Sequence, residues 1–424
     1  MTTTTPATAE ASPPIKIGHT PSNERLQSID ALRGFDMFWI SGGEYLFHAL
    51  ALTTGWSWAI FTSRQLIHSR DLGHWAGFTF FDLIQPLFLF ITGITLPLAV
   101  GRRLARGQTR AEVFRRLLFR AVVLVILGFL YDNGPISLVL AHNSFGGVLQ
   151  RIGVAGLIAG VIMMYTRPGA QMLWAIGILA AYWALLSFVP YPGQPTPGFE
   201  KGRNIVDYLD QHFMPGRFTV HSSEGWFSSP TTVASVLFGA LAGTWLISAR
   251  SIRRKLLGLG GAGLALLALG RLWALQCPII KDLFTSSYVV YATGWSCLLL
   301  ALFYGIIDGL GWRRWSFPFV LIGTNPLVLY LLVWTGWINF PYIAQFFFGW
   351  AFNYPGPPLH VSEAVANLAY SHPGFDWMSS DSVVGWTFPP VLASPHPFWQ
   401  MLATLAVEFL FLLWLYRRKI FWRV

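Results

Sequence analysis

Long apolar stretches separated by short polar segments dominate the chain. A helix needs roughly 20 mostly apolar residues to cross the hydrocarbon of a bilayer, and ten stretches approach that length. A further aromatic run, at 338–352, is either an eleventh span or a re-entrant or interfacial segment. The pattern predicts an all-α, polytopic helical membrane protein with about ten transmembrane helices, at 31–53, 78–99, 117–131, 146–165, 171–190, 230–248, 256–276, 287–306, 316–337 and 398–416.

Composition supports the membrane class. Of the 424 residues, 54% are hydrophobic and only 11% are charged, whereas soluble domains have about 25% charged residues. Residues 1–24 are rich in Thr, Pro, Ala and Ser and lack the apolar core of a signal peptide, so we expect a disordered N-terminal tail there. Residues 25–424 are then a single transmembrane domain. Cys277 and Cys297 do not have metal-ligand spacing, so no metal site is predicted.

The basic residues define an orientation. The formal charge of +10 comes from short clusters between apolar runs, which is typical of membrane orientation and not of a nucleic-acid-binding face. With ten spans and both termini in the cytoplasm, 21 of the 29 Lys and Arg residues fall on the inside. A full span at 338–352 would move the last basic cluster outside, so we expect a re-entrant or interfacial piece. The outer side then carries two long loops, 191–229 and 338–397.

Several charged residues fall at membrane depth, where charge is costly and marks functional sites. The orientation places Glu44, Asp82 and Arg151 in the outer half of the membrane, and His74 at the same level just before the second apolar stretch. A histidine base with a carboxylate that orients its ring is an arrangement for proton transfer. The alternative is that Asp82 and Arg151 form a buried ion pair with a purely structural role.

Two further features lie in the first and ninth stretches. Asp30 and Arg33 are three residues apart at the inner start of the first stretch, a spacing typical of a structural pair on one helix face. Asn325 precedes a proline that interrupts the ninth stretch near mid-membrane. Proline removes a backbone donor and frees carbonyl groups, so such a break more often lines a cavity or a site than lipid.

Short motifs follow one another in a fixed order from about residue 25 to the last residue. Together they resemble the transmembrane N-acetyltransferase family typified by heparan-alpha-glucosaminide N-acetyltransferase and its bacterial relatives. Each block alone is weak, and their shared order is specific. The blocks are Ser28 to Gly34, Trp75 to Pro86, Gly147 to Gly153, Glu224-Gly225, Lys281 to Val289, Gly323 to Pro326, and Lys419 to Trp422.

The resemblance implies an enzyme that takes acetyl from cytoplasmic acetyl-CoA and delivers it to an amino sugar or similar glycan acceptor on the outer side. It also implies a lipid bilayer as the environment, in this case the bacterial inner membrane, no nucleic-acid partner, and a homodimer. A transporter or flippase of a sugar or lipid-linked intermediate is the alternative, because charged intramembrane residues and a broken helix suit it equally. The absence of a visible internal repeat argues against the transporter.

The family places a catalytic histidine, the base or acetyl carrier, just before the block at Trp75. The usual family spacing falls on Leu72, whereas this chain has His74 directly before Trp75 and His68 seven residues before it. We favour His74, and His68 becomes the match if four residues are inserted after it.

The resemblance also assigns roles around that histidine. Glu44 falls on a family asparagine and, with Asp82, is expected to orient the histidine. The candidates for substrate or CoA binding, some of them as oxyanion donors, are Arg151, Asn325, Lys281, Asp30, Arg33 and Glu224.

Overall fold

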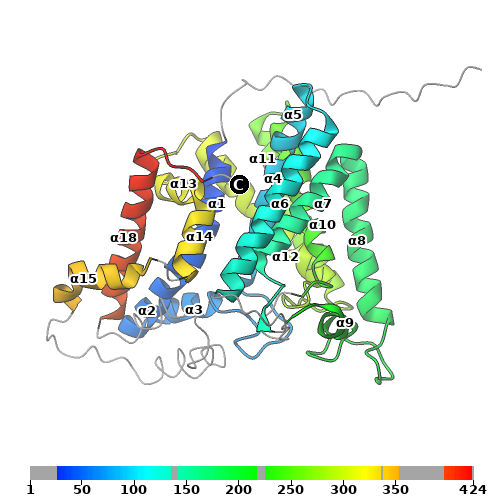
Figure 1. The fold of residues 1–424 in the computed structure, drawn as a ribbon, viewed down its shortest axis with the longest axis horizontal. Helices are drawn as coiled ribbons and strands as arrows, with labels where there is room; N and C mark the ends of the chain where they lie inside the picture. Colours follow the sequence, from blue (N-terminus) through cyan, green and yellow to red (C-terminus); the bar gives the residue numbers. More distant parts are fainter. Residues whose placement is uncertain (1–25, 135–141, 217–224, 336–337, 353–395, 423–424) are drawn as a thin grey trace, which may run out of the picture.

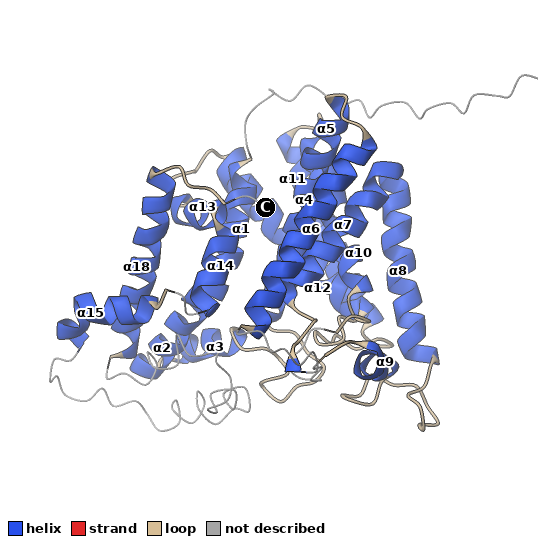
Figure 2. Ribbon diagram, in the orientation of Figure 1, coloured by secondary structure: helices blue, strands red, loops and turns tan. Residues whose placement is uncertain are grey.

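The computed structural model describes residues 26–134, 142–216, 225–335, 338–352 and 396–422. Within these ranges the chain is helical and contains no β-sheet (Figure 2). Seven helices of the described residues are long and apolar enough to cross a membrane, so the protein is an all-α polytopic membrane protein. They are Phe81–Ala105, which contains α4 (Ile84–Leu96) and α5 (Arg102–Ala105); α7, Val148–Tyr165; α8, Pro168–Phe188; α10, Pro230–Ile247; α11, Ile252–Trp273; Ser286–Gly309, which begins with α12 (Ser286–Phe303); and α18, Pro397–Arg417.

The other three predicted spans are also helical but differ from these seven. α6 (Arg110–Asn133) is 24 residues long, and four arginines lie in its first three turns. The first stretch consists of α1 (Gln27–Phe38) and α2 (Glu44–Thr54), joined by a π-turn. The ninth is divided into α13 (Phe317–Thr324) and α14 (Pro326–Thr335) at Asn325. Ten spans therefore remain a prediction. Among the described residues, seven helices are long and apolar enough to cross a membrane.

The break in the first stretch redirects the chain. Gly42 in the π-turn Trp39–Gly43 has a φ of 129°, a conformation that side-chain-bearing residues rarely adopt. Figure 1 shows α1 running from the upper to the lower side of the bundle and α2 lying near its lower end beside α3 (Ser57–Gln65). The bend places Glu44, the first residue of α2, in a buried position.

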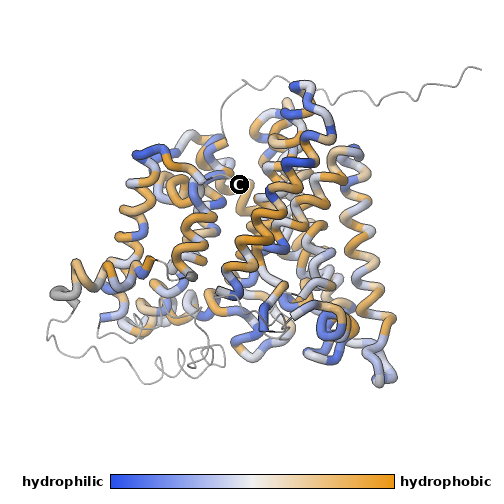
Figure 3. Tube along the Cα trace, in the orientation of Figure 1, coloured by the Kyte–Doolittle hydropathy of each residue, from blue (hydrophilic) through white to orange (hydrophobic). Residues whose placement is uncertain are grey.

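The two sides of the bundle differ. In Figure 1, α1 begins and α18 ends at the upper side, where the basic connection between α5 and α6 also lies. Figure 3 shows hydrophilic segments at both sides and a more hydrophobic middle. The identification of the upper side as cytoplasmic stays a prediction, and the start of α1 and the end of α18 both fall on this side, as that prediction requires.

Short helices lie across the lower side. α9 (Ile205–Phe213) occupies the predicted outer loop 191–229. α15 (Phe340–Phe352) has 13 residues, hence a length of about 20 Å against a hydrocarbon thickness of about 30 Å. It crosses the direction of α18 in Figure 1, as expected for an interfacial or re-entrant segment. The rest of the loop 338–397, from residue 353 to 395, and the tail 1–24 fall outside the described residues.

Glycine contacts fix the helices that carry the site. A Cβ at Gly93 of α4 would lie 2.0 Å from the Val236 carbonyl of α10, and one at Gly239 would lie 2.0 Å from the Phe90 carbonyl. Backbones approach this closely only where small residues meet. α4 is therefore held against α10, and the residues at its outer end have a fixed position.

Candidate functional site

Two loops meet at the lower side of the bundle. The first joins α3 to α4, and the second joins α11 to α12. The Gly77 N–H donates to the Ile279 carbonyl at 2.9 Å, which ties one loop to the other. The Tyr288 hydroxyl of α12 donates to the Asp82 carbonyl at 2.6 Å. The contact joins the start of α12 to the helix that follows the first loop.

Asp82 organises the first loop from a buried position, with 1% of its surface exposed. Its Oδ2 accepts hydrogen bonds from the backbone N–H groups of Ser69 at 3.2 Å and Thr79 at 3.0 Å. Its Oδ1 lies 2.8 Å from Nδ1 of His68. Because Oδ2 is held by backbone donors, the carboxylate is fixed, and it presents Oδ1 to the imidazole.

Lys281 approaches the same imidazole from the second loop. Its Nζ lies 2.9 Å from Nε2 and 3.1 Å from Nδ1 of His68. The carboxylate of Asp82 attracts the proton of the ring to Nδ1, so Nε2 carries the lone pair and accepts from the ammonium. In this tautomer the Lys281 Nζ and the His68 Nδ1 both carry protons, so their contact brings two donors together. His68 is held as one tautomer between an anion and a cation.

The surroundings keep His68 neutral. Burial and, after it, the Lys281 ammonium lower the pKa of His68 below its usual 6.5, against the opposing effect of Asp82 and Asp71. A neutral imidazole at neutral pH has a lone pair available to take a proton. The arrangement can therefore act as a general base once the Lys281 ammonium moves away from Nε2.

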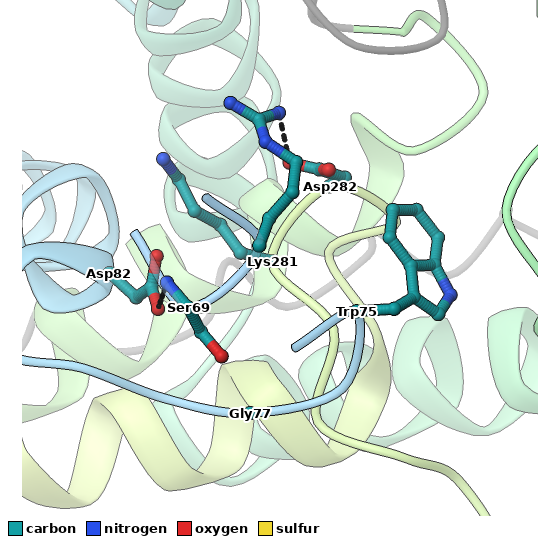
Figure 4. Close-up of a pocket in the computed structure, with 7 residues that line it drawn as sticks. Ser69, Trp75, Gly77, Asp82, Lys281 and Asp282 are labelled. Atoms are coloured by element: carbon teal, nitrogen blue, oxygen red, sulfur yellow. Dashed lines mark hydrogen bonds and ion pairs between the residues drawn. The ribbon is translucent and has the colours of Figure 1, made fainter. Parts of the chain in front are cut away.

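A small polar pocket opens beside this group. Its free interior is comparable with one water molecule, enough for part of a substrate in this state. Arg70 crosses the pocket wall: its Nε donates to Asp71 and its Nη1 to Asp282, both at 2.9 Å. Figure 4 shows Lys281 and Asp82 on one part of the wall and Trp75 on another. The lining residues are Ser69, Arg70, Trp75, Gly77, Asp82, Lys281 and Asp282.

His74, the histidine that the sequence favoured, lies outside this group. Its side chain is exposed, and only its backbone is bound: the N–H donates to the Ser69 carbonyl at 3.0 Å and the carbonyl accepts from the Ser69 hydroxyl at 3.1 Å. The geometry supports His68 instead. The signal in the sequence was the alternative match, in which four residues are inserted between His68 and the block at Trp75.

Glu44 lies near the site. It is buried at the start of α2, hydrogen-bonds with Tyr45 and interacts electrostatically with Lys281. No direct bond between Glu44 and either His68 or Asp82 occurs in the described part of the chain. Its position does not support orientation of the histidine.

Arg151 is held elsewhere. Its Nη2 donates to the Gly225 carbonyl at 3.0 Å and to the Ser228 hydroxyl, and its guanidinium lies 5.3 Å from the centre of the Phe284 ring. No ion pair joins Arg151 to Asp82, whose carboxylate bonds His68 and the first loop. The alternative of an Asp82–Arg151 ion pair is wrong, because Arg151 serves the segment that leads into α10.

Three of the remaining candidates lie away from the pocket. Asn325 fastens the C-terminal segment: its amide donates to the Ile420 carbonyl at 3.0 Å and its carbonyl accepts from the Trp422 N–H at 2.9 Å. Asp30 and Arg33 form an ion pair at 3.4 Å in α1, towards the opposite side of the bundle. Glu224 lies outside the described residues.

The pocket also contains residues that sequence reasoning missed. Asp282 follows Lys281 within a recognised block, and this adjacency was the available signal. Arg70 lies in an irregular loop, where no periodicity indicates which way a side chain points. Among the described residues no group of three metal-ligand side chains comes together.

Comparison with known proteins identifies distant relatives. No family model matches the chain. It is 23% identical to the heparan-alpha-glucosaminide N-acetyltransferase of Mus musculus, over 61% of this chain and 48% of that protein. The Homo sapiens protein of the same name is 24% identical, over 72% of this chain and 52% of its own length. The chain thus spans about half the length of these relatives. The protein is a distant relative of the heparan-alpha-glucosaminide N-acetyltransferases.

Proposed function

We propose that this protein is a membrane-embedded acetyltransferase that moves acetyl from acetyl-CoA to the amino group of an amino sugar or similar glycan acceptor. The observation that carries the proposal is the imidazole of His68, fixed between Asp82 and Lys281 at the edge of a polar pocket. The distant relatives, both named as N-acetyltransferases, support the reaction class.

The reaction needs a base, and Nε2 of His68 is placed to be one. The acceptor nitrogen attacks the thioester carbonyl carbon, a C–N bond forms, and the C–S bond breaks as CoA leaves as the thiolate. A proton passes from the nitrogen to Nε2 and then to the thiolate. General-base catalysis by a positioned side chain contributes about 10²- to 10⁴-fold. His68 is thus the proposed catalytic residue.

Lys281 has a second part in this proposal. Its ammonium must leave Nε2 before the imidazole accepts a proton, and the developing oxyanion of the tetrahedral intermediate then provides a new acceptor for it. A donor aimed at an oxyanion is typically worth about 10²- to 10³-fold in rate. Asp82 fixes the tautomer throughout, because its Oδ1 keeps the proton of the ring on Nδ1.

The two substrates are proposed to approach from opposite sides. The loop that carries His68 follows α3 at the lower side of the bundle, and α5 and the start of α6, which are rich in arginine, lie at the upper side (Figure 1). We assign the upper side to the cytoplasm and to the entry of acetyl-CoA, and the lower side to the glycan acceptor. A place in the bacterial inner membrane and a homodimer belong to the same proposal.

The test uses the full-length chain purified in detergent, with acetyl-CoA as donor and glucosamine as the acceptor probe. We expect His68→Ala to lower acetyl transfer by about 10²- to 10⁴-fold. His74→Ala is the matched control, since it removes a neighbouring histidine that makes no side-chain bond among the described residues, and it should retain turnover within a few-fold of the parent.

Two outcomes would overturn parts of this scheme. Loss of turnover in His74→Ala with retention in His68→Ala would refute the assignment of the base. Failure of the parent protein to transfer acetyl from acetyl-CoA to glucosamine or a larger amino-sugar glycan would refute the acetyltransferase itself. The unfolding midpoint of each variant, followed by tryptophan fluorescence, separates loss of chemistry from loss of fold.

A further inference from the structure

Asp282 has one oxygen in use and one available. Its Oδ1 accepts from Nη1 of Arg70 at 2.9 Å, whereas its Oδ2 is buried and accepts no hydrogen bond within the described part of the chain. The residue lines the pocket next to Lys281 (Figure 4). A buried carboxylate oxygen without a donor costs free energy, so this oxygen is suited to receive a donor from a ligand.

The charges around the pocket favour a cationic ligand. Of the residues that line the pocket, Asp82 and Asp282 are carboxylates and Arg70 and Lys281 are cations, and both oxygens of Asp82 are already bonded. While His68 is neutral, Oδ2 of Asp282 is therefore the anionic acceptor that this lining offers to a ligand. A ligand with one positive charge would pair with this oxygen.

We infer that Oδ2 of Asp282 binds the ammonium group of the acceptor, and that this contact makes the enzyme select an amine over a hydroxyl at the reacting position. The inference rests on the proposed acetyltransferase function and names the residue that recognises its acceptor. Asp282 follows Lys281 in the chain, so an amine held by its carboxylate lies close to the lysine whose ammonium contacts His68.

Trp75 supplies the other part of this subsite. Its indole Nε1 donates to the Phe199 carbonyl at 2.7 Å, which fixes the ring in the pocket wall. The Lys201 ammonium lies 5.8 Å from the centre of the ring. An indole held in this way presents apolar surface to the C–H face of a sugar ring, and the carboxylate of Asp282 binds the amino substituent. The pair suits an amino sugar rather than a simple alkyl amine.

The acceptor enters as an ammonium group and leaves as an amide, so its nitrogen loses two protons. The first is lost before attack and reaches solvent, and the second passes to Nε2 of His68 and ends on the thiol of CoA. Asp282 holds the ammonium and orients the free amine that remains, and forms no covalent bond.

The experiment compares Asp282→Asn with Asp71→Asn in the full-length protein. The first change keeps an oxygen for Arg70 and removes the charge in the pocket. The second removes a charge from the other partner of the same arginine, outside the pocket lining. We expect Asp282→Asn to raise KM for glucosamine by about 10- to 100-fold, because a hydrogen bond to a charged group is lost, with little change in KM for acetyl-CoA.

A third measurement tests selectivity directly. Glucose, which has a hydroxyl in place of the amine, is added as a competitor of glucosamine. In the parent protein and in Asp71→Asn it should compete weakly. In Asp282→Asn its inhibition constant should approach the KM for glucosamine. A role limited to holding Arg70 would leave the ratio of these two constants unchanged.

The outcomes separate the two proposals. Unchanged KM for glucosamine in Asp282→Asn, or equal increases in Asp282→Asn and Asp71→Asn, would overturn the ammonium site while acetyl transfer by the parent still stands. Absence of acetyl transfer in the parent would remove the proposed function first. If Asp282→Asn does not fold, Asp282→Glu, which keeps the charge and shifts its position, should raise KM for glucosamine and leave the preference over glucose.

Discussion

Two groups of buried charged residues lie near the lower side of the bundle, and their bonds differ in kind. In the first, around His68, the carboxylate of Asp82 and the ammonium of Lys281 both contact an imidazole beside a pocket. In the second, Arg151 donates to a backbone carbonyl and a serine hydroxyl, and Asp210 of α9 accepts from the backbone N–H groups of Trp226 and Phe227.

The contrast shows how charges at membrane depth divide between chemistry and structure. Backbone groups that leave water need partners, and a charged side chain satisfies several at once. Arg151 and Asp210, in the second group, provide these partners for the segment that leads into α10. In the first group the charges instead set the tautomer and the pKa of one ring. Depth and charge alone place Asp82 and Arg151 together, and the identity of their partners separates them.

Asp82→Asn should produce the largest effect. An amide at this position can donate to Nδ1 of His68, which would move the proton of the ring to Nε2 and remove the base. We expect kcat/KM for acetyl transfer to fall by about 10²- to 10⁴-fold, with the affinity for acetyl-CoA little changed. Steady-state kinetics and a binding measurement check both parts.

The matched change in the second group is Arg151→Gln, which should lower the unfolding midpoint while the folded fraction keeps its kcat/KM within a few-fold. An equal loss of kcat/KM in the two variants would mean that the groups form one site after all, and would contradict the division.

Much of the fold was predictable from the sequence, because apolar length alone locates helices in a membrane protein. Each of the ten predicted stretches contains helix in the structure. The bend at Gly42 was not predicted, since a glycine in an apolar run gives no sign of its φ. The break at Asn325 was predicted, because proline follows it, and the structure shows that the asparagine is bonded to the C-terminal segment. The sequence pattern locates the break in the helix, and tertiary contacts determine what the residue at the break binds.

The site was predictable in part. Asp82 and Lys281 belong to recognised blocks, and both reach the site. The choice of His74 over His68 followed from distance along the chain to Trp75. In the folded loop the chain turns after His68, which accommodates the four residues of the alternative match, and the His68 ring lies beside Asp82. Irregular loops have no period that relates spacing to direction, so the sequence could not decide between the two histidines.

Lys281→Gln should have the next largest effect and should alter the pH dependence. We expect a fall of about 10²-fold in kcat/KM, from the lost oxyanion donor. The ammonium lowers the pKa of His68, so its removal raises that pKa. Because the base acts only when neutral, the acid limb of the profile of kcat/KM against pH should move to higher pH. A limb that stays in place, or moves to lower pH, would contradict the contact between Lys281 and His68.

Asp210→Ala should act on stability. Its removal leaves the N–H groups of Trp226 and Phe227 without their acceptor, and each unsatisfied buried donor costs about 1 to 3 kcal/mol. The unfolding midpoint in detergent should therefore fall clearly. The acid limb of the profile of kcat/KM against pH should stay where it is in the parent, since His68 lies in the other group. A shift of that limb would show that the two groups are electrostatically coupled.

Asp207→Asn should give the smallest effect, visible only when pH is varied. Burial raises the pKa of Asp207 from 3.8 to about 6. The folded protein therefore binds this proton more tightly than the unfolded chain, and the stability that the proton contributes is complete below about pH 4 and is lost as pH rises through about 6. An asparagine does not ionise, and its oxygen still accepts from the Gly202 N–H and the Asn204 amide.

The unfolding midpoint of Asp207→Asn should accordingly change less between pH 4 and pH 7 than that of the parent. Burial also raises the pKa of Asp210, so a smaller slope of the same sign should remain. A variant whose midpoint follows the parent across this range would show that Asp207 titrates as it does in water. Titration of Asp207 would then not affect stability, whereas titration of His68 would still control turnover.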